Sequence, residues 1–569
     1  MIEEALPSLR RFTFLALLSA VLLIGGMLLV RWLTTPEHTP GQIIITPQNI
    51  AQPVITDQDN AVTQPGYRAS LYDTVWPTDM ANLNRSNSVI DAGLPRNVTA
   101  ETVAIDSVAM PYPVFAYTRD VDEVFVIGGT SFVLDRYVSE IDGMGELGLL
   151  QGQSAPHITK YNPFTGEQTR LALDRGVGSD YVGGALVHAN GYIYVVFQSH
   201  LYKIEPEAMT IERSVDLPLA PGLASRFTIY NGLSTSSTGE LITKYWSLVG
   251  EASSFFLIDP DTLVITHQLD YPGASPRLTV APAEDGREYL YHLNTRETFR
   301  MRIGPGALMV DPRWVSLYDP YNTGQAENEE PTSPVVVNGR VFYTTNTEFS
   351  ATQPMRIFWQ DGEAIYTRAS TPLTGLELYA GSEEGGWSFF HLSIDEASGV
   401  IIGKDQGNGL LTAVRARGDS EIERLWQIEL HTSARPAIVS DREMVYANDF
   451  VDGRDHLVVL DLMTGKEILR VPTPAVRATI ATIIVSAANE VYFGSNEPGQ
   501  PSGLFHRVYI PEEPGLIADV LRAPLAEDPP PAAIERQDCR AVQIQANRKQ
   551  ERQRADQRSS GTRSLPWPM

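Results

Sequence analysis

The stretch EMVYANDFVDGRDHLVVLDLMTGKEILRV, residues 443–471, contains the repeating unit that decides the fold. Its opening phrase is rich in β-branched and aromatic residues, which favour a strand. Similar phrases begin at residues 123 (EVFVIG), 191 (GYIYVVF), 240 (ELITKYW), 288 (EYLYHLN), 340 (RVFYTTN), 399 (GVIIGKD), 443 (EMVYAND) and 490 (EVYFGSN). Successive copies start 68, 49, 48, 52, 59, 44 and 47 residues apart. A repeat of roughly 40–50 residues with several strands is typical of a β-propeller blade.

The second half of the unit, VLDLMTGKE (459–467), predicts the turn between the third and fourth strands of a blade. Asp or Asn can cap such a turn through its side chain, and Pro fixes the required φ. Six similar segments occur at residues 160–168, 203–211, 257–265, 309–317, 359–367 and 416–424. Seven turns against eight opening phrases indicate that the last blade lacks a fourth strand.

A candidate for the missing strand lies upstream, at residues 101–108 (ETVAIDSV). Pairing it with the C-terminal blade closes the ring and removes the sheet edges that an open array exposes. We therefore predict an all-β fold, an eight-bladed β-propeller over residues 72–514. Seven blades is the alternative if the phrase at residue 123 begins an irregular blade, and a β-sandwich pair or a β-helix is the other alternative.

The N-terminus predicts a transmembrane helix. Residues 12–30 are uncharged and mainly apolar, with Arg10 and Arg11 before them and Arg31 after them. Nineteen residues at about 1.5 Å each just span a hydrocarbon core. Because no small-x-small exit follows, we expect residues 12–32 to be an uncleaved signal anchor rather than a cleaved signal peptide. The charges place residues 1–11 in the cytoplasm and predict a single-pass membrane protein with its propeller in the periplasm or otherwise outside the cytoplasmic membrane.

Two further segments are expected to lack regular structure. Residues 33–71 are rich in Pro, Thr, Gln and Asn and predict a flexible tether. Residues 515–569 predict a disordered basic tail, since residues 536–563 carry eight basic and three acidic residues. The net charge of residues 536–563 is therefore +5, and since the formal charge of the whole chain is −25, the other residues together carry −30. Such an acidic body repels nucleic acid, so we expect no nucleic-acid partner for the propeller.

Sequence motifs for catalysis are scarce. Cys539 is the one cysteine, which excludes an internal disulfide, a cysteine-rich zinc site and a c-type haem. Residues 143–148 (GMGELG) lack the Lys-Ser/Thr of a phosphate loop and the strand–helix context of a dinucleotide site. No Gly-x-Ser-x-Gly motif and no paired zinc-type histidines occur. We therefore predict no catalytic, cofactor-binding or metal-binding residue.

Two sets of polar residues still require an interpretation. Asp449, Asp452 and Asp455 could offer oxygen ligands to Ca²⁺, but their spacing is not that of a known calcium loop and favours an acidic hairpin. Three histidines in or beside predicted strands are expected to be hydrogen-bonded structural residues: His188, His292 and His391.

The repeat resembles that of the PQQ-like, quinoprotein-type propellers, in which a strand ending in Leu-Asp is followed by Thr-Gly-Lys and another strand. Residues 457–471 match best, and the lead-in with Trp76-Pro77, NLNRS (82–86) and AGLP (92–95) is similar too. The family contains dehydrogenases that bind PQQ and Ca²⁺ in the central funnel. It also contains non-catalytic, membrane-tethered propellers that bind proteins, such as the outer-membrane assembly scaffold.

This chain departs from the catalytic pattern, because it has no adjacent cysteines and most blades lack the recurring Trp. The resemblance therefore favours the non-catalytic branch. We expect a membrane-anchored binding or scaffold module, with an envelope protein as partner and no cofactor. The alternative is a PQQ- or metal-dependent oxidoreductase or hydrolase with its site in the funnel. Convergent carboxylates, Arg and a stacking Trp there would favour the enzyme, and an apolar or mixed outer groove would favour the scaffold.

Overall fold

The computed structural model of the chain describes the propeller region with several gaps. The described residues are 64–129, 156–174, 182–247, 251–273, 276–320, 332–345, 354–366, 374–377, 386, 388, 391–417, 421–474, 482–496 and 503–511. Our predictions for residues 1–11, 12–32, 143–148 and 515–569, for Cys539 and for most of the tether fall outside them. Within the described ranges, no helix combines the length and the apolar character needed to cross a bilayer.

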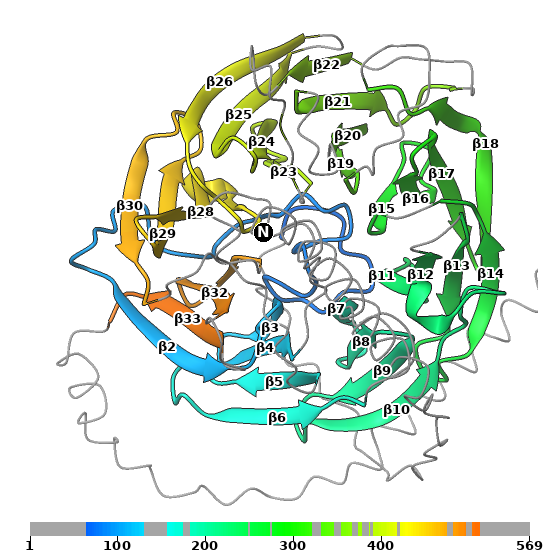
Figure 1. Ribbon diagram of the computed structural model, residues 1–569, viewed down its shortest axis with the longest axis horizontal. Coiled ribbons are helices and arrows are strands. Elements are labelled where there is room, and N and C mark those ends of the chain that lie inside the picture. The colour runs from blue at the N-terminus through cyan, green and yellow to red at the C-terminus, as the bar shows by residue number, and fades with distance from the viewer. Residues whose placement is uncertain are drawn as a thin grey trace, which may run out of the picture. The chain divides into compact units, whose positions relative to one another are not determined.

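Eight sheets surround a common axis, and each sheet is one blade (Figure 1). The inner strands of neighbouring blades contact one another, and the contact between β3 and β31 joins the first blade to the last. The eight-bladed propeller is thus confirmed.

The blades are numbered in chain order, each from its inner strand outward. Blade 1 contains β3 (Phe115–Asp120), β4 (Glu123–Gly128), β5 (His157–Tyr161) and β6 (Gln168–Ala172); blade 2 contains β7 (Val182–Val187), β8 (Ile193–Phe197), β9 (His200–Glu205) and β10 (Thr210–Asp216). Blade 3 contains β11 (Thr228–Thr235), β12 (Leu241–Ser247), β13 (Ser253–Ile258) and β14 (Ile265–Asp270); blade 4 contains β15 (Thr279–Pro282), β16 (Glu288–Leu293), β17 (Glu297–Gly304) and β18 (Ala307–Leu317).

Blade 5 contains β19 (Val335–Val337), β20 (Arg340–Thr344), β21 (Arg356–Asp361) and β22 (Thr374–Glu377); blade 6 contains β23 (Ser393–Ile394), β24 (Val400–Asp405), β25 (Leu410–Arg417) and β26 (Glu421–Glu429). Blade 7 contains β27 (Ala437–Val439), β28 (Met444–Val451), β29 (Arg454–Asp461) and β30 (Glu467–Pro472), with β1 (Ser88–Val89) added parallel to β27. Blade 8 contains β31 (Ile484–Ser486), β32 (Glu490–Asn496), β33 (Gly503–Tyr509) and β2 (Ala104–Met110). Two short 3-10 helices are η2 (Ser225–Phe227) and η4 (Ser440–Arg442).

Each repeated phrase forms the second strand of a blade, as predicted. These strands are β4, β8, β12, β16, β20, β24, β28 and β32. Their residues are almost entirely buried, because a second strand is covered on both faces by the neighbouring blades and on both edges by its own sheet. Burial on both faces explains why the phrases read as nearly continuous apolar and aromatic runs rather than as alternating ones.

Six of the seven predicted turns lie between a third and a fourth strand. In the turn after β29, the Asp461 carboxylate accepts hydrogen bonds from the Met463 and Thr464 amides at 3.1 and 2.8 Å. Gly465 follows with φ of 67° and packs against the Trp426 ring, where a Cβ would lie 2.6 Å from a ring carbon. A left-handed backbone and a close aromatic neighbour together explain the Thr-Gly of this turn.

The prediction for residues 309–317 is wrong, because this segment lies inside the long edge strand β18. The turn of blade 4 occurs earlier, where Gly304 pairs with Ala307 and Gly306 has φ of 64°. Pro312 is tolerated because an outermost strand has a free side that needs no amide donor. In residues 359–367 the third strand ends at Asp361 as expected, but the fourth strand begins only at Thr374.

The upstream strand closes the ring as predicted. β2 is antiparallel to β33, with register from Ala104 opposite Tyr509 to Met110 opposite Gly503. Buried His506 links three strands of this sheet, since its ring nitrogens lie 2.8 Å from the Ser107 and Ser495 hydroxyls. Blade 8 is therefore made of two segments about 400 residues apart in sequence, and it fastens the two ends of the ring.

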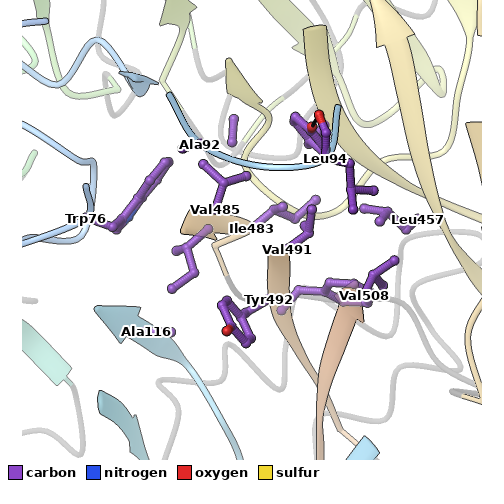
Figure 2. Close-up of a cluster of buried hydrophobic side chains, with 14 of the residues drawn as sticks. Trp76, Ala92, Leu94, Ala116, Leu457, Ile483, Val485, Val491, Tyr492 and Val508 are labelled. Atoms are coloured by element: carbon purple, nitrogen blue, oxygen red, sulfur yellow. Dashed lines mark hydrogen bonds between the residues drawn. The ribbon is translucent and has the colours of Figure 1, made fainter. Parts of the chain in front are cut away.

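The largest apolar cluster joins blades 7, 8 and 1 to the segment that precedes β2. Figure 2 shows Trp76, Ala92 and Leu94 of that segment near Ile483 and Val485 of blade 8, all of them within one buried cluster. Trp76, Ala92 and Leu94 are fully buried. The upstream segment is thus part of the propeller core.

Candidate functional site

The ring axis is occupied by the chain itself. We call residues 71–94 the entry segment. Its backbone accepts hydrogen bonds from the inner strands in blade order: Thr118 N to Trp76 O at 2.9 Å, Val187 N to Pro77 O at 2.7 Å, Val280 N to Leu83 O at 2.9 Å, Val336 N to Asn84 O at 3.1 Å, Ile394 N to Ser86 O at 2.8 Å and Ile438 N to Asn87 O at 3.0 Å. At blade 8 the direction reverses, and Gly93 N donates to Ser486 O at 3.0 Å.

The entry segment therefore winds round the inside of the ring, from blade 1 to blade 8, and appears in blue at the centre of Figure 1. The inner strand of a blade is an edge strand whose outer amides would otherwise face the axis without partners. The segment supplies an acceptor for such an amide in six blades, and in blade 8 it supplies a donor to a carbonyl. Ala81, Arg85 and Asn87 have positive φ of 65°, 64° and 57°, although none is glycine. Such strained conformations persist only where the surroundings hold them firmly.

A group of charged side chains lies within this packing. The Asp79 carboxylate of the entry segment is 3.3 Å from the Arg85 guanidinium, 3.2 Å from that of Arg277 and 4.0 Å from that of Arg435. Arg277 also donates to the Gly183 carbonyl of blade 2 at 2.7 Å. All four charged side chains are at most 8% exposed. One carboxylate thus stands among three guanidinium groups.

Three further residues complete the surroundings of this charge. The Phe115 ring lies 4.8 Å from the Arg277 guanidinium and 5.5 Å from that of Arg435, so both cations contact its π system. Lys404 of β24 donates to the Ala434 carbonyl, next to Arg435 in sequence, at 2.7 Å. His391, at the entrance to blade 6, is only 6% exposed. We call Asp79, Arg85, Arg277, His391, Lys404 and Arg435 the axial cluster.

The propeller repeat explains why distant residues meet here. Arg277, His391 and Arg435 each stand two residues before the inner strand of a blade, namely β15, β23 and β27. Ser333 and Thr482 occupy the same position before β19 and β31, and both are buried. Because equivalent positions of a closed ring face the same end of the axis, basic residues at this position in blades 4, 6 and 7 converge.

Electrostatics in the axial cluster are dominated by the cations. Burial opposes the charged form of Asp79, but the three guanidinium groups outweigh it and hold the pKa of that carboxyl below its ordinary value. Burial, together with the neighbouring arginines and Lys404, holds the pKa of His391 well below its usual range, so the imidazole is neutral at pH 7. Burial and the Arg435 charge lower the pKa of the Lys404 ammonium well below its ordinary value.

This arrangement suits anions better than metal ions. Guanidinium groups donate several hydrogen bonds in a fixed plane and match carboxylate or phosphate oxygens. The cluster carries three guanidinium charges against one carboxylate, and Lys404 adds a further positive charge when it is protonated. Among the described residues, no group of three or more His, Cys, Asp or Glu side chains is placed to hold a metal ion.

The acidic series is a hairpin, as predicted. Asp452 and Gly453 form the turn between β28 and β29, with φ of 54° and 69°. Asp449 accepts a hydrogen bond from Arg470 at 2.7 Å, and buried Asp455 accepts one from Asn448 at 2.9 Å. Asp449 and Asp455 thus bind partners within blade 7.

Two of the three histidines have the predicted structural role. His188 contacts the Gly239 carbonyl at 3.1 Å, and His292 contacts the Pro276 carbonyl at 2.8 Å. His391 differs, since its Nε2 atom is buried without a hydrogen-bond partner in the described part of the chain. It belongs to the axial cluster instead.

Reasoning from the sequence missed Arg277 and Arg435 entirely, and it quoted Arg85 only as part of NLNRS and Lys404 only as part of GVIIGKD. A signal did exist, because Arg277, His391 and Arg435 precede a repeated phrase by 11, 8 and 8 residues respectively. Aligning the blades at the position before the inner strand would have brought these residues together. No such alignment could have added Asp79, which lies outside the repeats.

Comparisons with known proteins identify no family. No family model and no curated protein match the sequence. A solved periplasmic gluconolactonase of Pseudomonas aeruginosa is 12% identical, over 57% of this chain and 95% of its own, with a TM-score of 0.37. The Dos1 propeller is 10% identical over 71% and 96%, with a TM-score of 0.43, and the WD40 domain of SCAP from fission yeast is 9% identical over 72% and 95%, with a TM-score of 0.41.

Proposed function

We propose that this protein is a membrane-anchored, extracytoplasmic propeller of the PQQ-like type, acting as a binding or scaffold module for envelope proteins. The observation that carries the proposal is the occupied axis. The entry segment bonds to seven inner strands, and its side chains Trp76, Met80, Ala81, Leu83 and Val89 are at most 3% exposed. With the axis filled by the chain, the rims and outer faces of the blades are the surfaces that remain for a partner.

The residues at the ring axis also match the enzyme alternative poorly. A quinone cofactor with its calcium ion needs space and carboxylate ligands in the funnel. Here Asp79 is the carboxylate of the axial cluster, and three guanidinium groups already surround it. Trp76 is fully buried in the apolar cluster of blades 7, 8 and 1. The arginines are therefore present, but convergent carboxylates and an axial stacking Trp are not found among the described residues.

Support for the membrane anchor comes from the sequence. The apolar run at residues 12–30 has the length of a spanning helix, and its flanking arginines favour an N-terminus in the cytoplasm. Fractionation of cells that express the full chain tests this part. We expect the chain in the membrane fraction, resistant to carbonate and released by detergent. A double variant, Leu18→Arg with Leu22→Arg, should lose this behaviour, whereas Leu18→Ile with Leu22→Ile should keep it.

The funnel is tested by titrating the detergent-solubilised full chain with PQQ and Ca²⁺ while absorbance and melting temperature are followed. We expect no change beyond that caused by Ca²⁺ alone. A saturable stabilisation with a new cofactor absorbance would refute the scaffold and support the oxidoreductase.

Binding of a partner is tested by photo-crosslinking in cells, with a photoreactive amino acid at exposed apolar positions. Ile365 and Phe164 are 72% and 55% exposed and lie outside the blade cores. We expect discrete crosslinks to envelope proteins from at least one of these positions, and none from buried Val126. If all such positions give no crosslinked partner, the scaffold proposal fails even where the PQQ titration is negative.

A further inference from the structure

We propose that the basic stretch of the C-terminal segment, residues 536–563, binds the anionic headgroups of the bilayer that holds the predicted anchor. The inference rests on the membrane anchor of the proposed function and adds a second, electrostatic attachment near the other end of the chain. The stretch lies outside the described residues. The bilayer is indicated by the charge of the stretch and by the place at which the chain leaves the ring.

The chain enters the propeller at one end of the ring axis. Gly66 N donates to the Glu396 carboxylate at 3.1 Å, and Ala189 N donates to the Ser70 carbonyl at 2.9 Å. Glu396 lies between β23 and β24, and Ala189 lies between β7 and β8. Both therefore belong to connections between the first and second strands of a blade. We call the end of the ring that carries these connections the turn end.

The chain leaves the propeller at the same end. β33, the third strand of blade 8, runs antiparallel to β32, and Val508 near the end of β33 pairs with Val491 near the start of β32. The start of a second strand lies at the turn end, so β33 finishes there. Ile510 and Pro511 follow it directly, and the described part of the chain stops at Pro511. The described propeller thus begins and finishes at the turn end.

The lengths of the two connecting segments allow both attachments to reach one bilayer. Residues 33–63, 31 in number, connect the predicted anchor to the ring, and residues 512–535, 24 in number, connect the ring to the basic stretch. A flexible chain of n residues has an r.m.s. end-to-end distance of about 5–6 Å × √n, which gives about 30 Å for the first segment and about 27 Å for the second. An anchor that holds the turn end near a bilayer therefore brings the basic stretch within reach of its headgroups.

Charge separates the roles of the ring and the stretch. Connections at the turn end carry exposed acidic residues in blades 1, 4 and 7, namely Asp122, Glu284 and Asp441. An anionic bilayer repels such a surface. Residues 536–563 carry +5, and Leu565 and Trp567 follow them. Lys and Arg are attracted to anionic headgroups, and Trp favours the interface between membrane and water. The stretch therefore supplies an attraction to anionic lipid that the turn end lacks.

The test uses Cys539, which lies in the basic stretch and is the one cysteine of the chain, so the unmodified protein takes a single fluorescent label. The labelled full chain is placed in nanodiscs of phosphatidylcholine alone, or of two parts phosphatidylcholine to one part phosphatidylglycerol. Both contain the same fraction of a lipid with a nitroxide on its headgroup, which quenches a nearby label. We expect quenching to be at least about threefold stronger with phosphatidylglycerol, because the anionic surface attracts the stretch. It should be lost at about 1 M salt, where the Debye length falls from about 10 Å to about 3 Å.

Variants separate charge from other properties of the stretch. Four cations are neutralised together in the test variant: Arg548→Gln, Lys549→Gln, Arg552→Gln and Arg554→Gln. Its net charge over residues 536–563 falls from +5 to +1, and quenching should fall to the level seen in phosphatidylcholine alone. The control variant alters neighbouring uncharged residues and should keep the full quenching: Gln550→Asn, Gln553→Asn and Gln557→Asn.

The proposal is overturned if the two lipid compositions quench the label equally, or if the test variant is quenched as strongly as the unmodified protein. A salt-sensitive rise in the anisotropy of the label without quenching by lipid would also overturn it, since the stretch would then bind an acidic protein surface. Failure of the anchor is a separate result. A chain that carbonate removes from membranes would refute the anchor, and the labelled chain can still be mixed with preformed vesicles of the same two compositions to test the stretch.

Discussion

Asn84 offers a direct test of whether the entry segment holds the ring together. Its side chain is 4% exposed and forms three hydrogen bonds. The amide nitrogen donates to the Val336 carbonyl of blade 5 and to the Glu396 carboxylate of blade 6, each at 2.7 Å, and the amide oxygen accepts from Tyr67 N at 2.8 Å. One side chain thus connects the entry segment to Tyr67, which precedes it, and to two blades.

Replacing Asn84 by Ala removes all three bonds. A buried hydrogen bond contributes about 1 kcal/mol net, and one to a charged group somewhat more, although Glu396 is partly exposed and regains water. We expect a loss of about 3 kcal/mol in the free energy of unfolding. With about 2.1 cal/mol/K per residue over the roughly 450 residues of the propeller, that loss lowers the melting temperature by about 3 °C. Asn84→Asp should cost more, because it loses the donor and places a second carboxylate beside Glu396.

Urea unfolding of the full chain in detergent, followed by tryptophan fluorescence, measures the difference. Asn162→Ala is the control, since the Asn162 side chain accepts two backbone amide hydrogen bonds in an exposed turn of blade 1. It should cost about 1 kcal/mol or less. If Asn84→Ala costs no more than Asn162→Ala, or if Asn84→Asp is the milder of the two Asn84 variants, the segment does not stabilise the ring in the way inferred here.

Three other predictions concern ring closure, acid stability and the turns. Val108→Asp, in the middle of the closing strand β2, should lower the free energy of unfolding in urea by about 2–3 kcal/mol. Asp106→Ala, on the same strand but with a side chain that is 51% exposed, should lower it by less than about 1 kcal/mol. Equal effects of the two variants would contradict closure of the ring by β2. Burial lowers the pKa of His506 to about 4, below its unfolded value of about 6.5, so the unfolded chain binds more protons and stability falls as pH drops between these values. His506→Gln should therefore reduce the slope of stability against pH in that window, by up to about 1.4 kcal/mol per unit, and an unchanged slope would reject the assignment. Gly465→Ala should destabilise the protein by about 2 kcal/mol more than Gly453→Ala, because both glycines have positive φ but only Gly465 packs against an indole ring. Similar unfolding midpoints for the two variants would show that the contact with the indole ring does not require glycine at position 465.

The acidic hairpin is a case in which the local sequence predicts the structure correctly. The Asp-Gly pair between two apolar runs predicts a turn, and the structure places the turn there, with Asp452 and Gly453 both at positive φ. The misplaced turn at residues 309–317 shows the opposite case. Asp-Pro resembles a turn signal, but Gly306 provides a stronger one a few residues earlier, and an edge strand accepts Pro312 without loss. When two turn signals lie within ten residues of each other, the local sequence does not show which of them forms the turn.

The axial cluster was missed for a different reason. Asp79, Arg277 and Arg435 are separated by 198 and 158 residues, and in the sequence only the position before a repeated phrase connects Arg277 with Arg435. They meet because ring closure brings the entrances of different blades to the same end of one axis. The strain at Arg85 is also a tertiary feature, since an arginine has no intrinsic preference for positive φ.

What the sequence alone determined is the blade: its strands, most of its turns, the number of copies and the strand that completes the last one. These follow from side-chain periodicity and turn chemistry, which act over a few residues and repeat along the chain. Only the tertiary structure decided that residues 71–94 would wind round the axis and bring one carboxylate among three arginines. Unsatisfied inner edges and buried charge exist only after the ring has closed, so the forces that place this segment act only in the assembled propeller.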